Sequence, residues 1–317
     1  MKSFRNIRSW TEYRTILAEE FGITLTQEPA ESCRLVRGHR IRIDEWSPSG
    51  PANGTVMLVH GGGGNGRILA PLAEPIAELG WRVIAPDLPG YGLSEPAPGF
   101  KGEYGEWPAV LAEIADAEPG PLVMMGLSMG GLTAFLAAQT SGKVSGVIAT
   151  TLLDLSDRDI FIRAGRWKWL GRLSLFGMTA APWLFDQIVM PLSLATPLAA
   201  MSGNRRLQAY FRKDPLIGAG WKPARFFRTV HNHRVESWAL HCPLLLVHPG
   251  KDTWTPTELS LSVFEKINAT KRFVELSNGS HLPAETPAYR ELIAEVTNFL
   301  NEIRRSSSPL EVDQDQA

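Results

Sequence analysis

Short, nearly continuous apolar runs recur along the chain and predict the strands of one sheet. Runs of this kind are typical of parallel strands that are covered on both faces. They are TVMLVH (55–60), RVIAPD (82–87), PLVMMG (121–126), VSGVIATTLL (144–153), PLLLVH (243–248) and RFVELS (272–277). The segment RLVRGHRIRIDEW (34–46) differs, because apolar and polar positions alternate around a Gly-His turn. That alternation predicts an amphipathic hairpin at the edge of the sheet.

Helix-like segments lie between these runs. They are ILAPLAEPIAEL (68–79), LTAFLAAQ (132–139), ELSLSVFEKI (258–267) and ELIAEVTNFLNEI (291–303), and a further helix is expected near the N-terminus. Strands that alternate with helices predict an α/β fold with a doubly wound, mostly parallel sheet.

The regular spacing fails once, between residues 155 and 240. This insert has no comparable strand run, carries five of the ten tryptophans, and holds 13 Lys and Arg against 5 Asp and Glu. Its position after the sixth strand predicts a helical cap at the carboxyl edge of the sheet, where open α/β sheets bind ligands. We therefore expect a core from 1–154 and 241–305, a cap or lid from 155–240, and a disordered tail from 306–317.

Composition changes this picture little. The chain has 317 residues, 44% of them hydrophobic, and a formal net charge of -1, which gives no reason to expect nucleic acid as a partner. Cys33 and Cys242 lie far apart without metal-ligand spacing, so we interpret both as reduced, structural and buried, and we expect no metal and no cofactor.

Two segments bear on localisation. The N-terminus has scattered charges and no apolar core of a secretory signal, so a cytoplasmic protein is expected. The most apolar stretch, 174–201, is interrupted by Asp186 and three prolines, which predicts short apolar helices and not a membrane span.

The motif GLSMGG (126–131) lies where a predicted strand ends and a helix begins. In G-x-S-x-G, the glycines permit a strained turn that presents the serine oxygen at the top of a sheet. Ser128 is therefore the candidate nucleophile. The alternative is a serine that caps the N-terminus of its helix.

A serine nucleophile needs a base and a group that orients the base. His281 is the candidate base, because it follows the last strand and lies beyond the acid candidate; a surface-loop histidine is the alternative. Asp252 follows the strand 243–248 and is the candidate acid, unless it only caps the next helix. Asp154, which also ends a strand, is the rival acid.

The stretch HGGGGNGR (60–67) follows the first long strand, and its bare N–H groups suit an oxyanion. We expect Met129 and Gly62 as the two donors, with Gly61 and Gly63 beside them. A phosphate loop is one alternative, but the stretch lacks the GK[ST] ending of a P-loop. A dinucleotide site is another, because Asp87 lies near the position where that motif carries its acidic residue.

Together these features resemble the α/β-hydrolase family. The likeness rests on HGGGG (60–64), DLPGYGLSEP (87–96), GLSMGG (126–131) and the chain order Ser128, Asp252, His281. It implies those three residues as nucleophile, acid and base, and Gly62 with Met129 as oxyanion donors. Serine at 128 also argues against the dehalogenases and epoxide hydrolases of this fold.

Within the insert, RKDPL (212–216) and RFFRTV (225–230) are similar to the monoacylglycerol lipase and lysophospholipase-like branch, and a branch that opens acyl-homoserine lactones is also compatible. The sequence thus predicts a serine hydrolase for a small-molecule ester or lactone with an apolar acyl group. The basic, tryptophan-rich insert would suit contact with lipid or a membrane surface. The alternatives are a non-catalytic binding protein, and acyl transfer or C–C hydrolysis with the same residues; substrate and oligomeric state stay open.

Overall fold

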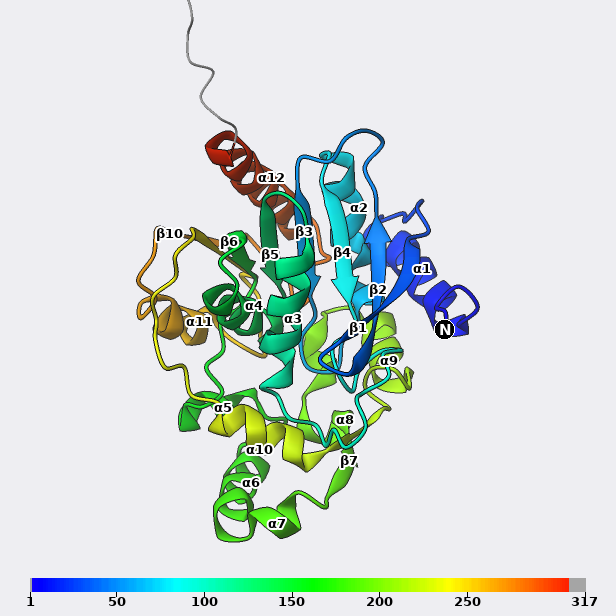
Figure 1. Cartoon of the computed structure of the whole chain (residues 1–317). Helices are drawn as coiled ribbons and strands as arrows, with labels where there is room; N and C mark the ends of the chain where they lie inside the picture. The colour runs from blue at the N-terminus through cyan, green and yellow to red at the C-terminus, as the bar shows by residue number, and fades with distance from the viewer. Residues whose placement is uncertain (1, 308–317) are drawn as a thin grey trace, which may run out of the picture.

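A mixed, mostly parallel sheet forms the centre of the molecule (Figure 1). The computed structural model describes residues 2–307. Within them, the main sheet has eight strands in the order β1-β2-β4-β3-β5-β6-β9-β10. Their bounds are β1 Ala30–Val36, β2 His39–Trp46, β3 Thr55–Val59, β4 Arg82–Pro86, β5 Leu122–Gly126, β6 Val144–Ala149, β9 Leu244–His248 and β10 Lys271–Glu275. Neighbours from β4 to β10 pair in parallel, which confirms the fold class predicted from the apolar runs.

Helices cover both faces of this sheet. One apolar cluster packs α1 (Arg8–Phe21), α2 (Ala70–Glu78) and α12 (Ala288–Ser307) against it. A second packs α3 (Glu106–Ala117), α4 (Met129–Thr140) and α11 (Thr257–Phe264) against the opposite face. The sheet is therefore doubly wound, as expected. Helix α3 was absent from the predicted elements.

The edge hairpin forms with a turn one residue earlier than expected. Arg37 and Gly38 both have positive φ, 51° and 81°, and His39 already pairs with Val36 as the first residue of β2. Two successive positive φ values are typical of a type I′ turn, which matches the twist of the strands it joins. The expectation that His39 lies in the turn is therefore wrong; its ring is buried.

The insert, residues 155–240, lies beyond the end toward which the parallel strands point (Figure 1). Most of it is helical, but β7 and β8 form a short antiparallel pair that the apolar pattern did not predict. The elements are α5 Arg158–Ala164, α6 Lys168–Ala180, α7 Pro182–Phe185, β7 Val189–Pro191, α8 Leu192–Ala195, η2 Leu198–Met201, α9 Arg205–Lys213, β8 Trp221–Pro223 and α10 Ala224–Asn232. Helix α9 packs on α1, where Tyr13 and Tyr210 stack with centroids 5.3 Å apart.

Three smaller expectations can be compared with the structure. Both cysteines are free, but Cys33 is exposed on the outer strand β1, so its interpretation as a buried residue is wrong; Cys242 is buried. Helix α12 continues to Ser307, two residues into the expected tail, and the rest of that tail, 308–317, lies outside the described residues. Among residues 2–307, no helix is both long and apolar enough to cross a bilayer.

Candidate active site

Strand register places the predicted chemistry at one edge of the sheet. Val59 at the end of β3 pairs with Gly126 at the end of β5, which pairs in turn with Ala149 at the end of β6. On the other side, His248 pairs with Glu275 at the ends of β9 and β10. The loops that follow these strands therefore meet at the same carboxyl edge.

Ser128 occupies a strained turn between β5 and α4. Its φ of 56° and ψ of -131° are rare for a residue with a side chain. A Cβ on Gly126 would lie 2.0 Å from the Gly130 carbonyl oxygen, and one on Gly130 would lie 2.2 Å from that of Val59. The motif thus needs glycine at both positions for steric reasons. The Ser128 hydroxyl makes no capping hydrogen bond to its helix, which disfavours the N-cap alternative.

A chain of two short hydrogen bonds connects Ser128 to His281 and Asp252. His281 Nε2 lies 2.7 Å from Ser128 Oγ, and His281 Nδ1 lies 2.7 Å from Asp252 Oδ2. Both His281 and Asp252 are buried, whereas Ser128 is partly accessible. Because an ionised carboxylate only accepts, Nδ1 carries the proton, which leaves Nε2 to accept from the serine hydroxyl.

The loop after β9 satisfies the Asp252 carboxylate with further donors. The backbone N–H groups of Trp254 and Thr255 donate to Oδ1 at 2.8 and 2.9 Å, and the Thr255 hydroxyl donates to Oδ2 at 2.7 Å. Burial alone would raise the pKa of Asp252, but the His281 charge and these hydrogen bonds lower it to about 2. The carboxylate is therefore ionised at neutral pH.

Trp254 and Thr255 are contacts of this site that the sequence analysis missed. The Trp254 ring lies 4.5 Å from the His281 ring, centroid to centroid, and packs against it at 43°. Both residues lie within three positions of Asp252 in DTWT (252–255), but no motif marks them. Only the loop geometry shows that they restrict the imidazole and the carboxylate.

The rival acid, Asp154, is not brought to His281. Its Oδ1 accepts hydrogen bonds from the backbone and hydroxyl of Ser156, and its Oδ2 lies 3.9 Å from the Lys266 ammonium. Its contacts are therefore with its own loop and with the turn that follows α11.

The glycine loop after β3 passes close to Ser128. Gly62, Ser128 and Met129 line the same cavity. A Cβ on Gly61 would lie 2.7 Å from Ser128 Cβ, and one on Gly63, at φ 87°, would lie 2.0 Å from a Leu192 methyl group. The loop can pass between the serine and the insert only because these positions lack side chains.

His60 anchors this loop and is not available as a base. Its Nδ1 donates to the Gly61 carbonyl at 2.8 Å, and its Nε2 accepts from the Leu88 N–H at 3.0 Å. Burial lowers the pKa of His60 to about 4, so the ring stays neutral.

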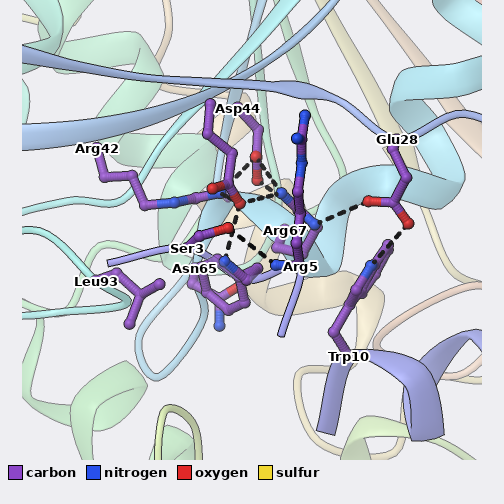
Figure 2. Close-up of polar contacts among 12 residues, drawn as sticks. Ser3, Arg5, Trp10, Glu28, Arg42, Asp44, Asn65, Arg67 and Leu93 are labelled. Atoms are coloured by element: carbon purple, nitrogen blue, oxygen red, sulfur yellow. Dashed lines mark hydrogen bonds and ion pairs between the residues drawn. The ribbon is translucent and has the colours of Figure 1, made fainter. Parts of the chain in front are cut away.

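A buried ionic cluster anchors the end of the glycine loop (Figure 2). Arg67 donates to Asp44 at 2.9 and 2.7 Å and to Glu31 at 2.6 Å, and Arg42 contacts the same two carboxylates. Figure 2 shows both guanidinium groups directed at Asp44. Arg67 is the last residue of HGGGGNGR, so the cluster fixes the end of the glycine loop to β2.

Asp87 belongs beside this cluster. Its carboxylate accepts from the Gly66 N–H at 2.7 Å and from the Leu93 N–H at 2.8 Å, and it lies 3.4 Å from Arg42. A fully buried carboxylate with these partners has no access to a ribose hydroxyl, which disfavours the dinucleotide alternative.

An apolar cavity of about 430 Å³ opens above Ser128. Its size lies in the range of small-molecule sites. The insert supplies most of its walls, from α5, α6, α7, α8 and α10, and Trp254 contributes from the core. The apolar lining residues of the insert include Phe161, Trp167, Leu170, Met178, Phe185, Leu192, Phe226 and Val230.

The fold and this arrangement agree with a family match. Residues 50–285 match the family described as serine aminopeptidase, S33, and the chain belongs to this family of α/β hydrolases.

Curated relatives of part of the chain are esterases. A segment of 126 residues is 36% identical to the pimeloyl-[acyl-carrier protein] methyl ester esterase of Xanthomonas oryzae pv. oryzae, and covers 37% of this chain and 46% of the relative. A segment of 83 residues is 37% identical to the esterase of the same name from Shewanella sp., covering 26% and 28%. The chain thus matches less than half the length of these relatives.

Solved structures resemble the chain over most of its length. A monoacylglycerol lipase from Paleococcus ferrophilus superposes with a TM-score of 0.64 at 21% identity, covering 83% of this chain and 99% of the other. A soluble variant of the monoglyceride lipase of Saccharomyces cerevisiae gives 0.68 at 17% identity, with 89% and 98% covered. The hypothetical protein PA2218 from Pseudomonas aeruginosa gives 0.70 at 14% identity, with 95% and 99% covered. At these identities the likeness establishes the fold.

Proposed function

We propose that this protein is a serine hydrolase that cleaves a carboxylic ester or lactone with an apolar acyl group through an acyl-enzyme. The observation that carries the proposal is the hydrogen-bonded chain from Ser128 through His281 to Asp252, which opens onto an apolar cavity. Family membership and the esterase relatives support ester hydrolysis more generally.

In this mechanism Ser128 Oγ attacks the substrate carbonyl while His281 Nε2 removes its proton. Asp252 orients the ring and stabilises the imidazolium that forms, and the same proton then passes to the leaving alcohol. A water molecule, deprotonated by His281, releases the acid from the acyl-enzyme. The short contacts on both nitrogens of His281 suit this role, because the ring needs no rotation to begin the reaction.

The N–H groups of Met129 and Gly62 are the proposed donors to the tetrahedral oxyanion. Both residues line the cavity at Ser128, and Gly61 and Gly63 shape the loop that presents them. Loss of one such donor typically costs about 2.7–4 kcal/mol of transition-state stabilisation.

The lining of the cavity favours an apolar acyl part. The curated relatives are named for the methyl ester of pimeloyl-[acyl-carrier protein], and one of the similar solved structures is named for monoacylglycerol. An acyl-homoserine lactone presents the same combination of acyl chain and ester carbonyl, so a lactone hydrolase is the second candidate.

Replacement of Ser128 tests the proposal. Ser128→Ala should abolish hydrolysis of p-nitrophenyl esters and labelling by a fluorophosphonate, while circular dichroism and the unfolding midpoint stay those of the wild type. Substantial residual turnover would exclude Ser128 as the nucleophile. A wild-type protein that neither labels nor hydrolyses would instead be a non-catalytic binding protein.

Substrate panels separate the remaining alternatives. Esters of increasing acyl length and acyl-homoserine lactones should be compared by kcat/KM. Product analysis with an added alcohol then distinguishes hydrolysis from acyl transfer, because a transferase would form the new ester. C–C cleavage would be recognised with a diketone substrate, which would yield a carboxylic acid and a ketone in place of an acid and an alcohol.

We further propose that the insert contacts a lipid surface from which substrate enters. Large apolar side chains are exposed on α6 and α7, and several neighbours of this patch, Trp167, Leu173, Ile188 and Leu194, also line the cavity. An exposed apolar patch continuous with a ligand cavity is typical of an interaction site. The excess of Lys and Arg in the insert would favour an anionic surface.

A further inference from the structure

A second pocket, of about 710 Å³, lies where the insert meets the loop after β4. Its floor comes from Pro89, Gly90 and Tyr91 of that loop, and its sides from residues 100–102, α7 and β8. Tyr91 and Phe226 line both this pocket and the apolar cavity above Ser128. Ser128 does not line the second pocket. The two sites are thus separated by aromatic side chains and differ in chemistry.

Lys222 of β8 is the distinctive residue of this pocket. Its side chain is 9% exposed, and its ammonium donates to the Gly90 carbonyl at 2.7 Å and lies 3.7 Å from the centre of the Tyr91 ring. Among residues 2–307, no carboxylate lies within 4.0 Å of it. Buried lysines are normally paired with a carboxylate, because desolvation disfavours the charge. Here burial lowers the pKa of Lys222 to about 8, which indicates that the contacts present do not replace the lost solvation.

The other charges around the pocket do not neutralise Lys222. Arg225 donates to Glu103 at 2.8 Å and to Asp186 at 2.7 Å, and Arg228 also pairs with Asp186. These ion pairs satisfy one another. Lys101, which is exposed, lines the same pocket and forms no ion pair in the described part of the chain. Two cations therefore face the pocket without a carboxylate partner.

We propose that this pocket binds a small organic anion, whose carboxylate or phosphate group is held by Lys222 and Lys101. The aromatic side chains of Tyr91, Phe100 and Trp183 line the remaining walls and would pack on an apolar or aromatic body. An oxyanion is the group that fits, because the Gly90 carbonyl and the Tyr91 ring leave this buried cation without a counter-charge. The proposal concerns a site other than the proposed esterase site and does not depend on it.

Isothermal titration calorimetry with benzoate, phenyl phosphate and benzamide tests this assignment. Benzoate and benzamide have nearly the same shape, but only benzoate carries a charge, so benzoate should bind at one site per chain and at least about tenfold more tightly. Phenyl phosphate distinguishes a phosphate-selective pocket from a carboxylate-selective one. The titrations should be repeated on Ser128→Ala, which should bind each probe as the wild type does.

Matched lysine variants decide where the anion binds. Lys222→Met keeps the length of the aliphatic side chain and should remove the preference for benzoate over benzamide. Lys101→Met, at an exposed position, should weaken benzoate severalfold without a risk to folding, and Lys213→Met, exposed on α9 outside the pocket, should change nothing. Equal binding of benzoate and benzamide, or anion binding that survives both Lys222→Met and Lys101→Met, would overturn the proposal.

Discussion

At the residue scale, the proposed chemistry depends on the protonation pattern of one imidazole, that of His281. Asp252 accepts from Nδ1 of His281, so Nε2 is left with a lone pair directed at Ser128 Oγ. Thr255 and the backbone of Trp254 occupy the other lone pairs of the carboxylate, which prevents it from turning away. The arrangement thus selects the tautomer that a general base requires.

Asp252→Asn should therefore reduce kcat for ester hydrolysis by about 10⁴-fold, because an amide can donate to Nδ1 and favours the wrong tautomer. Steady-state kinetics on a p-nitrophenyl ester measures the loss. The matched control is Asp154→Asn, which changes a buried carboxylate at another strand end and should leave kcat within a few-fold of the wild type. A larger loss in Asp154→Asn than in Asp252→Asn would transfer the role of the acid to Asp154.

The low pKa of Asp252 also predicts how stability depends on pH. Its folded-state pKa, about 2, lies below the ordinary value of 3.8, so ionisation of Asp252 stabilises the fold above about pH 4. This contribution, about 2 kcal/mol, should be lost as the pH falls from about 4 to about 2. Urea unfolding of the wild type and of Asp252→Asn across this range isolates it. The difference in unfolding free energy between the two proteins should shrink on acidification, and a constant difference would contradict the assignment.

At the scale of elements, the glycine loop depends on a support that its own residues do not provide. Its glycines are needed for close approach, but they also leave the loop without side-chain packing. Arg67 connects the end of the loop to Asp44 on β2 and to Glu31 on β1. The rings of Phe4 and Trp10 cover its guanidinium, at 5.3 and 4.9 Å from their centres. The hairpin and the N-terminal segment therefore stabilise the candidate oxyanion site.

Arg67→Met should lower the free energy of unfolding by about 3–5 kcal/mol, because it leaves buried carboxylates without their partner. Urea denaturation monitored by circular dichroism measures this change. Arg40→Met is the matched control, since Arg40 lies on the same strand as Arg42 with its side chain 59% exposed, and its pairing with Glu95 should contribute less than about 1 kcal/mol. Similar losses in the two variants would show that the cluster around Arg67 adds no particular stability.

Strands and strand-end residues were the parts of the structure that sequence reasoning could predict. Apolar runs identify the parallel strands, and parallel strands bring their carboxyl ends together. Ser128, Asp252 and His281 could therefore be assigned to one edge of the sheet from the sequence alone. Helix α3 was missed although Trp107, Val110, Leu111 and Ile114 follow helical spacing, because Pro108 lies in its first turn and a proline within such a pattern usually marks a break in the helix.

Contacts between distant segments could not be predicted. The Arg42–Arg67 cluster joins residues from the hairpin and the glycine loop, and each looks like an ordinary surface charge in its local sequence. The pair β7–β8 has only three residues in each strand, too few for a periodic signal. Trp254 could not be recognised from the sequence either, because its contact with His281 joins two segments that are distant in the chain.

At the scale of the whole molecule, the insert covers the carboxyl edge of the sheet and forms an apolar cavity there. Its helices provide most of the walls of the cavity above Ser128. Each methylene group that moves from water into such a cavity contributes about 0.8 kcal/mol. We therefore expect kcat/KM for p-nitrophenyl esters to rise by about fourfold per added acyl carbon until the cavity is filled. A flat profile from acetate onward would show that the acyl chain does not occupy this cavity.

The outer face of the insert should bring this cavity to a lipid surface. Phe176 and Trp183 are 69% and 73% exposed on α6 and α7, close in the chain to the basic residues Lys168 and Arg172. Apolar side chains beside cations favour an anionic bilayer interface, and the attraction weakens with salt. The protein should co-float with vesicles of phosphatidylglycerol and phosphatidylcholine more than with phosphatidylcholine alone, and added salt should reduce the difference.

One double variant and one single variant assign that binding to the insert. Phe176→Ser with Trp183→Ser should reduce flotation severalfold and should lower activity on vesicle-borne monoacylglycerol while leaving kcat/KM for a soluble short-chain ester unchanged. Leu35→Ser is the control, because Leu35 is 74% exposed on β1 and lies outside α6 and α7, so its loss should affect neither measurement. The soluble ester separates surface binding from chemistry, since it needs no interface to reach Ser128. Equal flotation of the wild type, the double variant and the Leu35 control would place any lipid contact elsewhere on the molecule.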